Sequence, residues 1–399
     1  MVTYPKDWDE SKLLDHVSLV QGLTYTPENV KPTGTLVLRS SNIQNGRLSL
    51  NDNVYVNAYV PEEKMVAQGD ILVCVRNGSS ALIGKSCVLP ELKYTTFGAF
   101  MSVLRGDTTG YFAKLFESNI VQEQVRGRSN ATINQITKKD FQSIQVTVPD
   151  KPEQEEIART LSQFDTYIDD LAELIEKKKG IREGALEDLI SGKTRIVGFS
   201  GERKDFSIND ITREVITGGT PSTSRREYYG GNIPWLASAE IHQKRITKPT
   251  TYITELGLQN SSAKIAPEKS VLIALAGQGK TRGTAAYLTK PMALNQSLAA
   301  LVTNEKCNSE FLYYLIESMY SSLRELSSGD GGRGGLNKKL IKGVLVTIPV
   351  DVDEQEAIAN TLLAMDEEIR DLETERDKII QIREGAMDDL LTGRIRLTK

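Results

Sequence analysis

The chain has 399 residues, of which 26% are charged and 39% hydrophobic, and its formal net charge is −4. Three cysteines lie far apart in the sequence and only two histidines are present, so neither a disulfide framework nor a Cys/His zinc site is indicated. The charged first ten residues predict no secretory leader, and the apolar run 271–276 is too short to span a bilayer. We therefore expect a cytoplasmic protein of two to four domains.

Residues 1–150 are predicted to form one α+β domain. Short apolar or alternating runs bounded by turn residues predict strands, and apolar residues at helical spacing predict one helix. The predicted strands are 35–38, 54–56, 71–75, 86–89, 101–104 and 144–148, and the predicted helix is 110–125.

A long helix is predicted from Pro152 to Gly192. Its apolar residues alternate spacings of four and three, which is the pattern of a coiled-coil seam. Asp150 can cap its start, and Gly192 can adopt the left-handed conformation that ends a helix. The seam consists of Ile157, Leu161, Phe164, Ile168, Leu171 and Ile175.

Residues 193–350 repeat the order of the first domain at a shift of about 200 residues. Leu115, Lys138 and Pro149 correspond to Leu315, Lys338 and Pro349. Between such positions the two copies share little, and their loops differ in length and residues. A common frame with diverged loops predicts two sites for related but non-identical targets.

The long helix also recurs, at a shift of 201 residues, from Asp353 to Gly393. The pentad Ile-Arg-Glu-Gly-Ala at 181–185 reappears unchanged at 382–386. The second seam consists of Ile358, Leu362, Met365, Ile369 and Leu372. The chain is therefore an internal tandem duplication.

The duplication predicts an α+β fold in which two tandem domains are separated by two long helices. Each seam requires a partner, and the other helix is the obvious one. Because a domain lies between the helices in sequence, we expect an antiparallel coiled coil with pseudo-two-fold symmetry. The expected parts are domain one at 1–150, a spacer helix at 151–192, domain two at 193–350 and a C-terminal spacer helix at 351–399.

Charge is distributed unevenly along the chain. The helical stretches 151–192 and 351–392 carry 6 basic against 11 acidic residues and 4 against 14. Residues 1–150 hold 15 of each sign, whereas residues 193–350 hold 21 basic against 13 acidic. The acidic helices can repel DNA while the second domain attracts it, and the first domain needs a locally basic face.

No catalytic motif is evident. The segment 274–281 ends Gly-Lys-Thr, but a phosphate-binding P-loop requires glycine at position 274 and a helix after Thr281. Position 274 is alanine, and the residues after Thr281 favour a turn and a strand. The two isolated histidines lack the neighbours of an acid–base or metal site. We therefore expect a non-catalytic chain without a metal.

Polar and basic loops are the candidate DNA-contacting segments, because Arg, Lys and Asn bind phosphates and base edges. A solvated connector is the alternative for each loop, and Trp235 also fits a core position. The candidates are Arg39, Ser41, Asn42, Arg76, Asn77, Lys85, Arg126, Arg128 and Asn130 in the first copy, and Trp235, Lys244, Arg245, Gln278, Lys280, Arg282, Arg333, Asn337 and Lys338 in the second.

With these features, the chain resembles the specificity subunit of type I restriction–modification systems. The resemblance rests on Glu153-Gln154-Glu155, Ile157-Ala158, Thr160-Leu161, the pentad and Gly192, together with their repeats, and it covers essentially the whole chain. It implies that each domain reads one half of a bipartite, asymmetric site in double-stranded DNA. It implies that this chain itself holds no cofactor. It also implies that the protein works in a bacterial or archaeal cytoplasm.

The resemblance also implies partner proteins. The helices would set the spacing of the half-sites and dock two methyltransferase subunits, which bring S-adenosylmethionine. A restriction subunit would bring ATP and Mg²⁺. The candidate docking residues are Gln154, Arg182, Gly184, Gln355, Arg383 and Gly385. The two glycines indicate a close helix crossing, room for a partner, or a tolerated glycine near a helix end.

Two alternatives remain at this point. The chain could be a coiled-coil scaffold that assembles proteins without reading DNA. An autonomous methyltransferase is disfavoured because the sequence has no Gly-rich cofactor loop and no Asn-Pro-Pro-Tyr-type motif.

Overall fold

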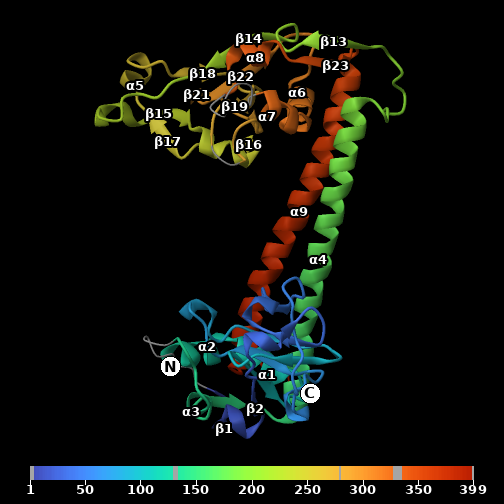
Figure 1. Ribbon diagram of the computed structural model, residues 1–399. Helices are drawn as coiled ribbons and strands as arrows, with labels where there is room; N and C mark the ends of the chain where they lie inside the picture. The colour runs from blue at the N-terminus through green and yellow to red at the C-terminus, as the bar shows by residue number, and fades with distance from the viewer. Residues whose placement is uncertain (1–3, 129–133, 278–279, 327–334, 398–399) are drawn as a thin grey trace. The chain divides into compact units, whose positions relative to one another are not determined.

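The computed structural model describes residues 4–128, 134–277, 280–326 and 335–397. The chain forms two compact units, and each unit contains one α+β region and parts of both long helices (Figure 1). Unit 1 comprises residues 1–172 and 374–399, and unit 2 comprises residues 173–373.

The described residues of unit 1 form two four-stranded sheets, two separate strand pairs (β1 with β12 and β5 with β6) and three short α-helices besides the long ones. The strand orders are β10-β4-β7-β3 and β2-β11-β8-β9, and β1 pairs separately with β12. The elements are β1 (Asp9–Lys12), β2 (Ser18–Gln21), β3 (Val30–Lys31), β4 (Thr35–Leu38), β5 (Ile43–Gln44), β6 (Arg47–Leu48), β7 (Val54–Val56), β8 (Ile71–Cys74), β9 (Ser86–Val88), β10 (Thr95–Phe97), β11 (Met101–Arg105), α1 (Tyr111–Glu117), α2 (Asn119–Arg128), α3 (Lys138–Phe141) and β12 (Gln145–Val148).

Unit 2 repeats much of this topology, but strands β14 and β15 are longer than their counterparts and the second sheet has a fifth strand, β16. Its sheets have the orders β17-β15-β21-β18 and β14-β22-β19-β20-β16, and β13 pairs with β23. The elements are β13 (Arg203–Ser207), β14 (Thr212–Thr217), β15 (Tyr229–Leu236), β16 (Arg245–Ile246), β17 (Thr251–Ile253), α5 (Glu255–Gln259), β18 (Lys264–Ala266), β19 (Val271–Ala274), β20 (Ala285–Leu288), β21 (Met292–Leu294), β22 (Leu298–Thr303), α6 (Ser309–Ser318), α7 (Tyr320–Leu326), α8 (Lys338–Lys342) and β23 (Leu345–Pro349).

The predicted strands of the first domain are present with small shifts, but the predicted helix 110–125 is wrong as a single element. It is two helices, α1 and α2, because Ser118 between them has an extended backbone and its hydroxyl donates to the Leu115 carbonyl. Such a side-chain bond competes with the helical hydrogen-bond ladder. The turn and strand expected after Thr281 are confirmed by β20, so this segment is not a P-loop.

The two long helices are α4 (Lys151–Ser191) and α9 (Val352–Leu391). Gly192 and Gly393 follow them with φ of 78° and 70°, the left-handed conformation that ends a helix at little cost for glycine. Each residue of both predicted seams is buried or half-buried, which confirms the periodicity.

The ends of both helices complete the hydrophobic cores. In unit 1, Ile157 and Leu161 from the start of α4 and Leu391 from the end of α9 pack with α1, α2 and β8. In unit 2, Leu362 from the start of α9 and Leu189 from the end of α4 pack in the same way. The first turns of each seam therefore belong to the core of an α+β region, together with the end of the other helix.

Contacts between the helices show that they pack antiparallel. In unit 1, the Tyr167 hydroxyl donates to Glu375 at 2.5 Å. In unit 2, Lys179 pairs with Glu373 at 2.8 Å and Lys178 with Glu368 at 2.5 Å. Residue numbers rise along α4 as they fall along α9, as an antiparallel pair requires.

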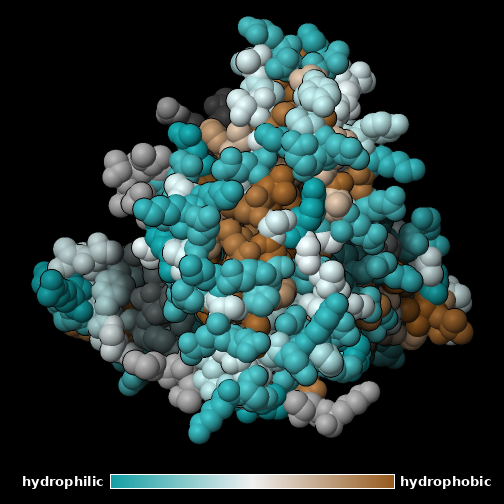
Figure 2. Space-filling model, turned by 90° about the horizontal axis from the view of Figure 1, so that it is seen from below, coloured by the Kyte–Doolittle hydropathy of each residue, from teal (hydrophilic) through white to brown (hydrophobic). Residues whose placement is uncertain are grey.

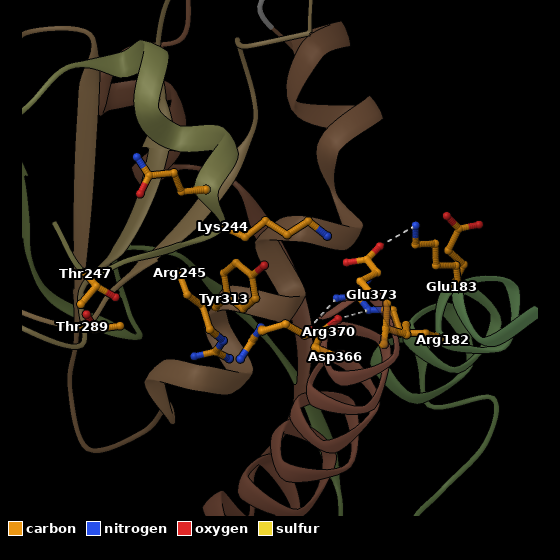
Figure 3. A pocket seen from close by; sticks show the side chains of 13 residues that line it. Arg182, Glu183, Lys244, Arg245, Thr247, Thr289, Tyr313, Asp366, Arg370 and Glu373 are labelled. Carbon is orange, nitrogen blue, oxygen red and sulfur yellow. Dashed lines mark hydrogen bonds and ion pairs between the residues drawn. The ribbon is translucent and has the colours of Figure 1, made fainter. Parts of the chain in front are cut away.

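An ion cluster centred on an arginine joins each α+β region to both helices. In unit 2, Arg182 of α4 donates to Asp366 of α9 at 2.9 Å and also pairs with Glu317 of α6. Figure 3 shows Arg182 and Asp366 directed toward each other at one side of a pocket of about 730 Å³, with Tyr313 and Arg245 at the other side. The duplicated cluster in unit 1 is centred on Arg383, with Asp165 and Glu117 at 2.5 and 2.9 Å from the guanidinium, and Lys114 also pairs with Asp165.

A second duplicated ion pair holds the segment that follows each long helix. Arg195 after α4 bonds Glu354 of α9 at 2.6 Å, and Arg396 after α9 bonds Glu153 of α4 at 2.8 Å. Both carboxylates are buried, and removing one partner of such a pair leaves an uncompensated charge. Arg396 also bonds Asp7, which ties the last described residues to the first strand region.

The surface is mainly hydrophilic in the view of Figure 2, where apolar side chains show in a central area surrounded by polar ones. Within the described part of the chain, no helix combines the length and the apolar composition that a membrane crossing requires.

The ion cluster of unit 1 makes stability depend on pH. Burial by itself raises the pKa of Asp165, but Lys114 and Arg383 lower it overall. A carboxyl group whose pKa is lower in the folded state than in the unfolded state stabilises the fold at pH values above the unfolded-state pKa, near 3.9. This stabilisation is lost as the pH falls through the folded-state pKa. We predict that Asp165→Asn lowers the thermal midpoint at pH 7 by roughly 3–8 °C, and that this difference shrinks between pH 4 and pH 2.

Asp170→Asn is the matched control, because Asp170 lies on the same helix and is exposed. Its midpoint should match the parent chain at each pH, as measured by scanning fluorimetry. An Asp165→Asn difference that stays constant with pH would show that the carboxylate charge is not the stabilising feature.

Candidate DNA interface

Four segments of unit 1 that are far apart in sequence meet at one end of its sheets. They are the 3₁₀ turn η3 (Ser40–Asn42) after β4, the loop 76–79 after β8, the turn 98–100 and the residues before α3. The Gly98 N–H donates to the Leu38 carbonyl at 2.9 Å, and the Asn77 side chain donates to the Ser40 hydroxyl at 3.1 Å. The Asn134 side chain donates to the Gly78 carbonyl at 3.0 Å.

Unit 2 has the same loop frame, by which we mean the set of converging loops and the backbone hydrogen bonds that hold them. The Asn295 N–H donates to the Leu236 carbonyl at 3.0 Å, as Gly98 does to Leu38. The Leu275 N–H donates to Ser297 at 2.8 Å, as Val75 does to Phe100 at 3.0 Å. The turn η7 (Ser238–Gln243) occupies the place of η3, and His242 bonds Thr281 across to the loop after β19.

Parallel pairing explains why these loops converge. β4 pairs parallel with β10, and β15 pairs parallel with β21, so the segments that follow each pair emerge at the same sheet end. In each unit, a glycine lets the segment after β2 or β14 pass close to the backbone at the end of β10 or β21. A Cβ at Gly22 would lie 2.0 Å from the Gly98 carbonyl oxygen, and one at Gly218 would lie 1.8 Å from that of Leu294.

In the first unit, the predicted residues divide into exposed and internal side chains. Arg76 and Arg126 are exposed, and Lys85 is half-buried. Arg39 pairs with Asp52 at 2.8 Å, and Arg128 bonds Ser143 beside β12 at 2.7 Å. The Ser41 hydroxyl is buried without a hydrogen-bond partner, Asn77 links two loops, and Asn130 lies outside the described residues.

In the second unit, Lys280 and Lys338 are exposed and Arg282 is half-buried. Lys244 pairs with Glu317 at 3.2 Å, and Asn337 caps α8 by accepting a hydrogen bond from the Leu340 N–H at 3.0 Å. Gln278 and Arg333 lie outside the described residues.

Three predicted DNA-contacting residues have structural roles instead. Asn42 is fully buried, and its side chain donates to the Ser49 and Asp52 carbonyls and accepts from the Arg39 N–H. Trp235 is buried and donates to Gly219, which agrees with the core alternative. Arg245 pairs with Glu310 at 2.7 Å and packs against the rings of two tyrosines. Their polar atoms are engaged inside the unit, so we remove them from the candidate set.

Most of the predicted docking residues are also internal. Gln154 and Gln355 are buried and donate to the carbonyls of Pro149 and Pro349, while Arg182 and Arg383 belong to the ion clusters. Gly184 and Gly385 differ, because a Cβ at either position would meet no atom within 4 Å. A close helix crossing at these glycines is therefore excluded in the structure, and an open surface remains.

Sequence reasoning missed two exposed residues in the turns at this end of the sheets. Phe100 is 56% exposed in the turn between β10 and β11. Gln296 is exposed in the corresponding turn of unit 2, and its side chain accepts a hydrogen bond from Thr220 at 2.6 Å. Each lies between two short apolar strands that the sequence alone did not separate, so no local signal marked the turns.

Comparison with known proteins connects this frame to a family. The family model described as "Type I restriction modification DNA specificity domain" matches residues 5–179 and 201–382, which is most of the chain. The chain belongs to the type I restriction–modification DNA specificity family. The two matched regions are its two target-recognition regions.

Individual relatives match over most of their length. The HindI specificity subunit of Haemophilus influenzae is 23% identical over 88% of this chain and 84% of its own length. The MjaVIII specificity subunit of Methanocaldococcus jannaschii is 24% identical over 84% and 81%. A crystal structure of the type I S subunit from M. genitalium superposes with a TM-score of 0.60 at 16% identity, covering 96% of both chains, which supports the fold.

Specificity subunits are non-catalytic and carry no cofactor themselves, since other subunits methylate and cleave. Among the described residues, no group of three or more His, Cys, Asp or Glu side chains is arranged to hold a metal.

The structural role of Asn42 is testable. Asn42→Ala removes an amide that satisfies three backbone groups, so we predict a loss of about 1–3 kcal/mol in the free energy of unfolding. Urea unfolding of the full chain measures this. Asn51→Ala, at an exposed position in the same loop region, should change the unfolding midpoint little. Equal midpoints for both variants would contradict the assigned role.

Proposed function

We propose that each recognition region of this specificity subunit reads one half of a bipartite, asymmetric site in double-stranded DNA. The observation that carries the proposal is the duplicated loop frame, which has the same backbone hydrogen bonds in both units but different exposed side chains. Identical frames with different side chains present different donors and acceptors to base edges. The site is therefore expected to have two unlike halves.

The chain is a subunit of a type I restriction–modification complex, and we propose its partners from that membership. Two methyltransferase subunits, which hold S-adenosylmethionine, would dock on the outer faces of α4 and α9. Gly184 and Gly385 lie on such open faces, where a partner backbone can approach closely. A restriction subunit with ATP and Mg²⁺ would join the complex beside cytoplasmic DNA.

We also propose that α4 and α9 set the distance between the half-sites. α4 has 41 residues and α9 has 40, which corresponds to roughly 60 Å each at 1.5 Å per residue. Two reading regions on one face of a duplex need a separation near 34–36 Å, about one helical turn. A helix pair of this length is long enough to hold such a separation while its ends remain packed in the cores.

Salt dependence distinguishes DNA reading from the scaffold alternative. The full chain should bind duplex DNA with an affinity that falls at least about 10³-fold between 50 and 200 mM salt. The double variant Lys280→Gln, Lys338→Gln should reduce the slope of log K against log salt by about 2. Titration of a labelled duplex by fluorescence anisotropy gives both values.

Lys290→Gln is the matched control for the salt series. Lys290 is exposed but precedes β21, at the sheet end opposite the converging loops. The slope of log K against log salt for this variant should therefore equal that of the parent chain. Binding that does not depend on salt would support the scaffold reading and contradict this proposal.

The spacing role is tested by length. Four helical residues inserted into α4 add roughly 6 Å, so the gap between the methylated half-sites should lengthen by one or two base pairs. Single-molecule methylation sequencing of cells that express the complex measures the gap. Replacing four exposed α4 residues without changing length controls for altered docking. A gap that stays constant in the insertion variant would defeat the spacing role.

A further inference from the structure

We propose that Arg76 and Phe100 form a two-residue base-reading element, which specifies a guanine and its neighbouring base in the half-site of the first recognition region only. The inference rests on the proposed function, in which this region reads one half-site. Two named side chains would carry that reading in the first region, and the second region would lack them.

The two side chains are held together on the converging face of unit 1. The Arg76 guanidinium carbon lies 5.1 Å from the centroid of the Phe100 ring, a cation–π contact. Both side chains are exposed, and the phenyl ring has 56% of its surface open to solvent. An exposed aromatic ring with a cation over it is a poor way to bury apolar surface but is well suited to contact an approaching ligand.

The backbone beneath the pair is rigid. The Phe100 carbonyl accepts hydrogen bonds from the N–H groups of Val75 and Arg76, at 3.0 and 3.2 Å. Arg76 also forms a β-bridge with Gln135, and the neighbouring Asn77 N–H donates to Asn134 at 3.2 Å. Three of the four converging segments thus support the pair, so little conformational freedom is lost when it binds.

The chemistry of the pair identifies the kind of contact. An arginine fork donates two hydrogen bonds to O6 and N7 of guanine, and a phenyl ring provides apolar contact for a thymine methyl group or an adjacent base face. Phosphate binding alone would not need the ring. The pair therefore fits a base step containing guanine and not the DNA backbone.

The second region has the same frame without the pair. The Leu275 N–H donates to Ser297 as the Val75 N–H donates to Phe100, and the Leu336 N–H donates to Leu275 as that of Ile136 donates to Val75. These contacts align Arg76 with Ala276 and Phe100 with Ser297. An arginine–phenylalanine pair in one region and an alanine–serine pair in the other cannot read the same base step.

The test compares variants of the full chain, expressed with its methyltransferase subunits, by single-molecule methylation sequencing. Phe100→Ser and Arg76→Ala, which introduce the residues of the second region, should relax one or two adjacent positions of a single half-site. Discrimination there should fall on the order of 10- to 100-fold, while the other half-site and the gap stay unchanged. Arg76→Lys keeps the charge but not the fork, and should relax the guanine position alone.

Tyr59→Ala is the matched control. Tyr59 is an aromatic residue that is 87% exposed, and the register of β4 with β7 puts it at the opposite end of the sheet from η3. Its methylation motif should equal that of the parent chain. Thermal midpoints of all variants establish that they are folded, and Arg76→Lys changes only an exposed side chain.

Two outcomes would overturn the inference. An unchanged motif in folded Arg76→Ala and Phe100→Ser variants would show that the pair does not contact bases. A uniform loss at all sites, with no position relaxed, would assign the pair to phosphate binding or to loop structure. Failure of the proposed function itself looks different, because the parent chain would then give no bipartite motif.

Discussion

The structure depends on the packing of both long-helix ends into each α+β core. Neither region buries its apolar surface with its own residues alone. Leu186, Leu189 and Ile190 complete the core of unit 2, and Met387, Leu390 and Leu391 complete that of unit 1. Because apolar burial is the main favourable term in folding, each region is held to a helix that comes from the other repeat. Each α+β region and the helix ends packed against it are therefore one packed body.

The duplicated ion clusters specify the relative position of the helices, which apolar packing alone does not. Apolar contacts are non-directional, whereas Arg182 and Arg383 each engage one carboxylate on the other helix and one on the α+β region. Such partly buried pairs contribute little net stability by themselves, but a shifted helix would leave their charges unpaired. They favour one register of the helices, which is what a spacing element needs.

The backbone hydrogen bonds that shape the loops are independent of the exposed loop side chains. This independence explains how two regions of one chain can differ in target. The hydrogen bonds that shape the converging loops are made by backbone groups, so they tolerate side-chain replacement. Ala276 and Ser297 occupy places where the first region has Arg76 and Phe100, and the strands on either side keep their pairing. Exposed loop side chains can thus diverge with little cost to the core, in agreement with where variable function resides on rigid scaffolds.

The sequence by itself determined the duplication, the two long helices with their glycine stops and the α+β class of the repeats. These follow from periodicity and spacing, which are local properties of the chain. Short strands such as β10, and the break at Ser118, were not predictable because pairing and one side-chain bond decide them. The antiparallel pairing of α4 and α9 was predicted only by combining the seam with the position of the second domain.

The tertiary structure alone decided which polar residues are available to a ligand. Asn42, Gln154, Arg182 and Arg245 have the side chains of a binding site, yet each satisfies groups inside its own unit. Phe100 was not among the sequence candidates, yet it is exposed on the converging face. A polar side chain serves equally well in a buried network and on a reading face, so its role depends on which segments the fold brings beside it. Parallel pairing between strands that are distant in sequence brings these segments together. No local sequence pattern indicates such pairing.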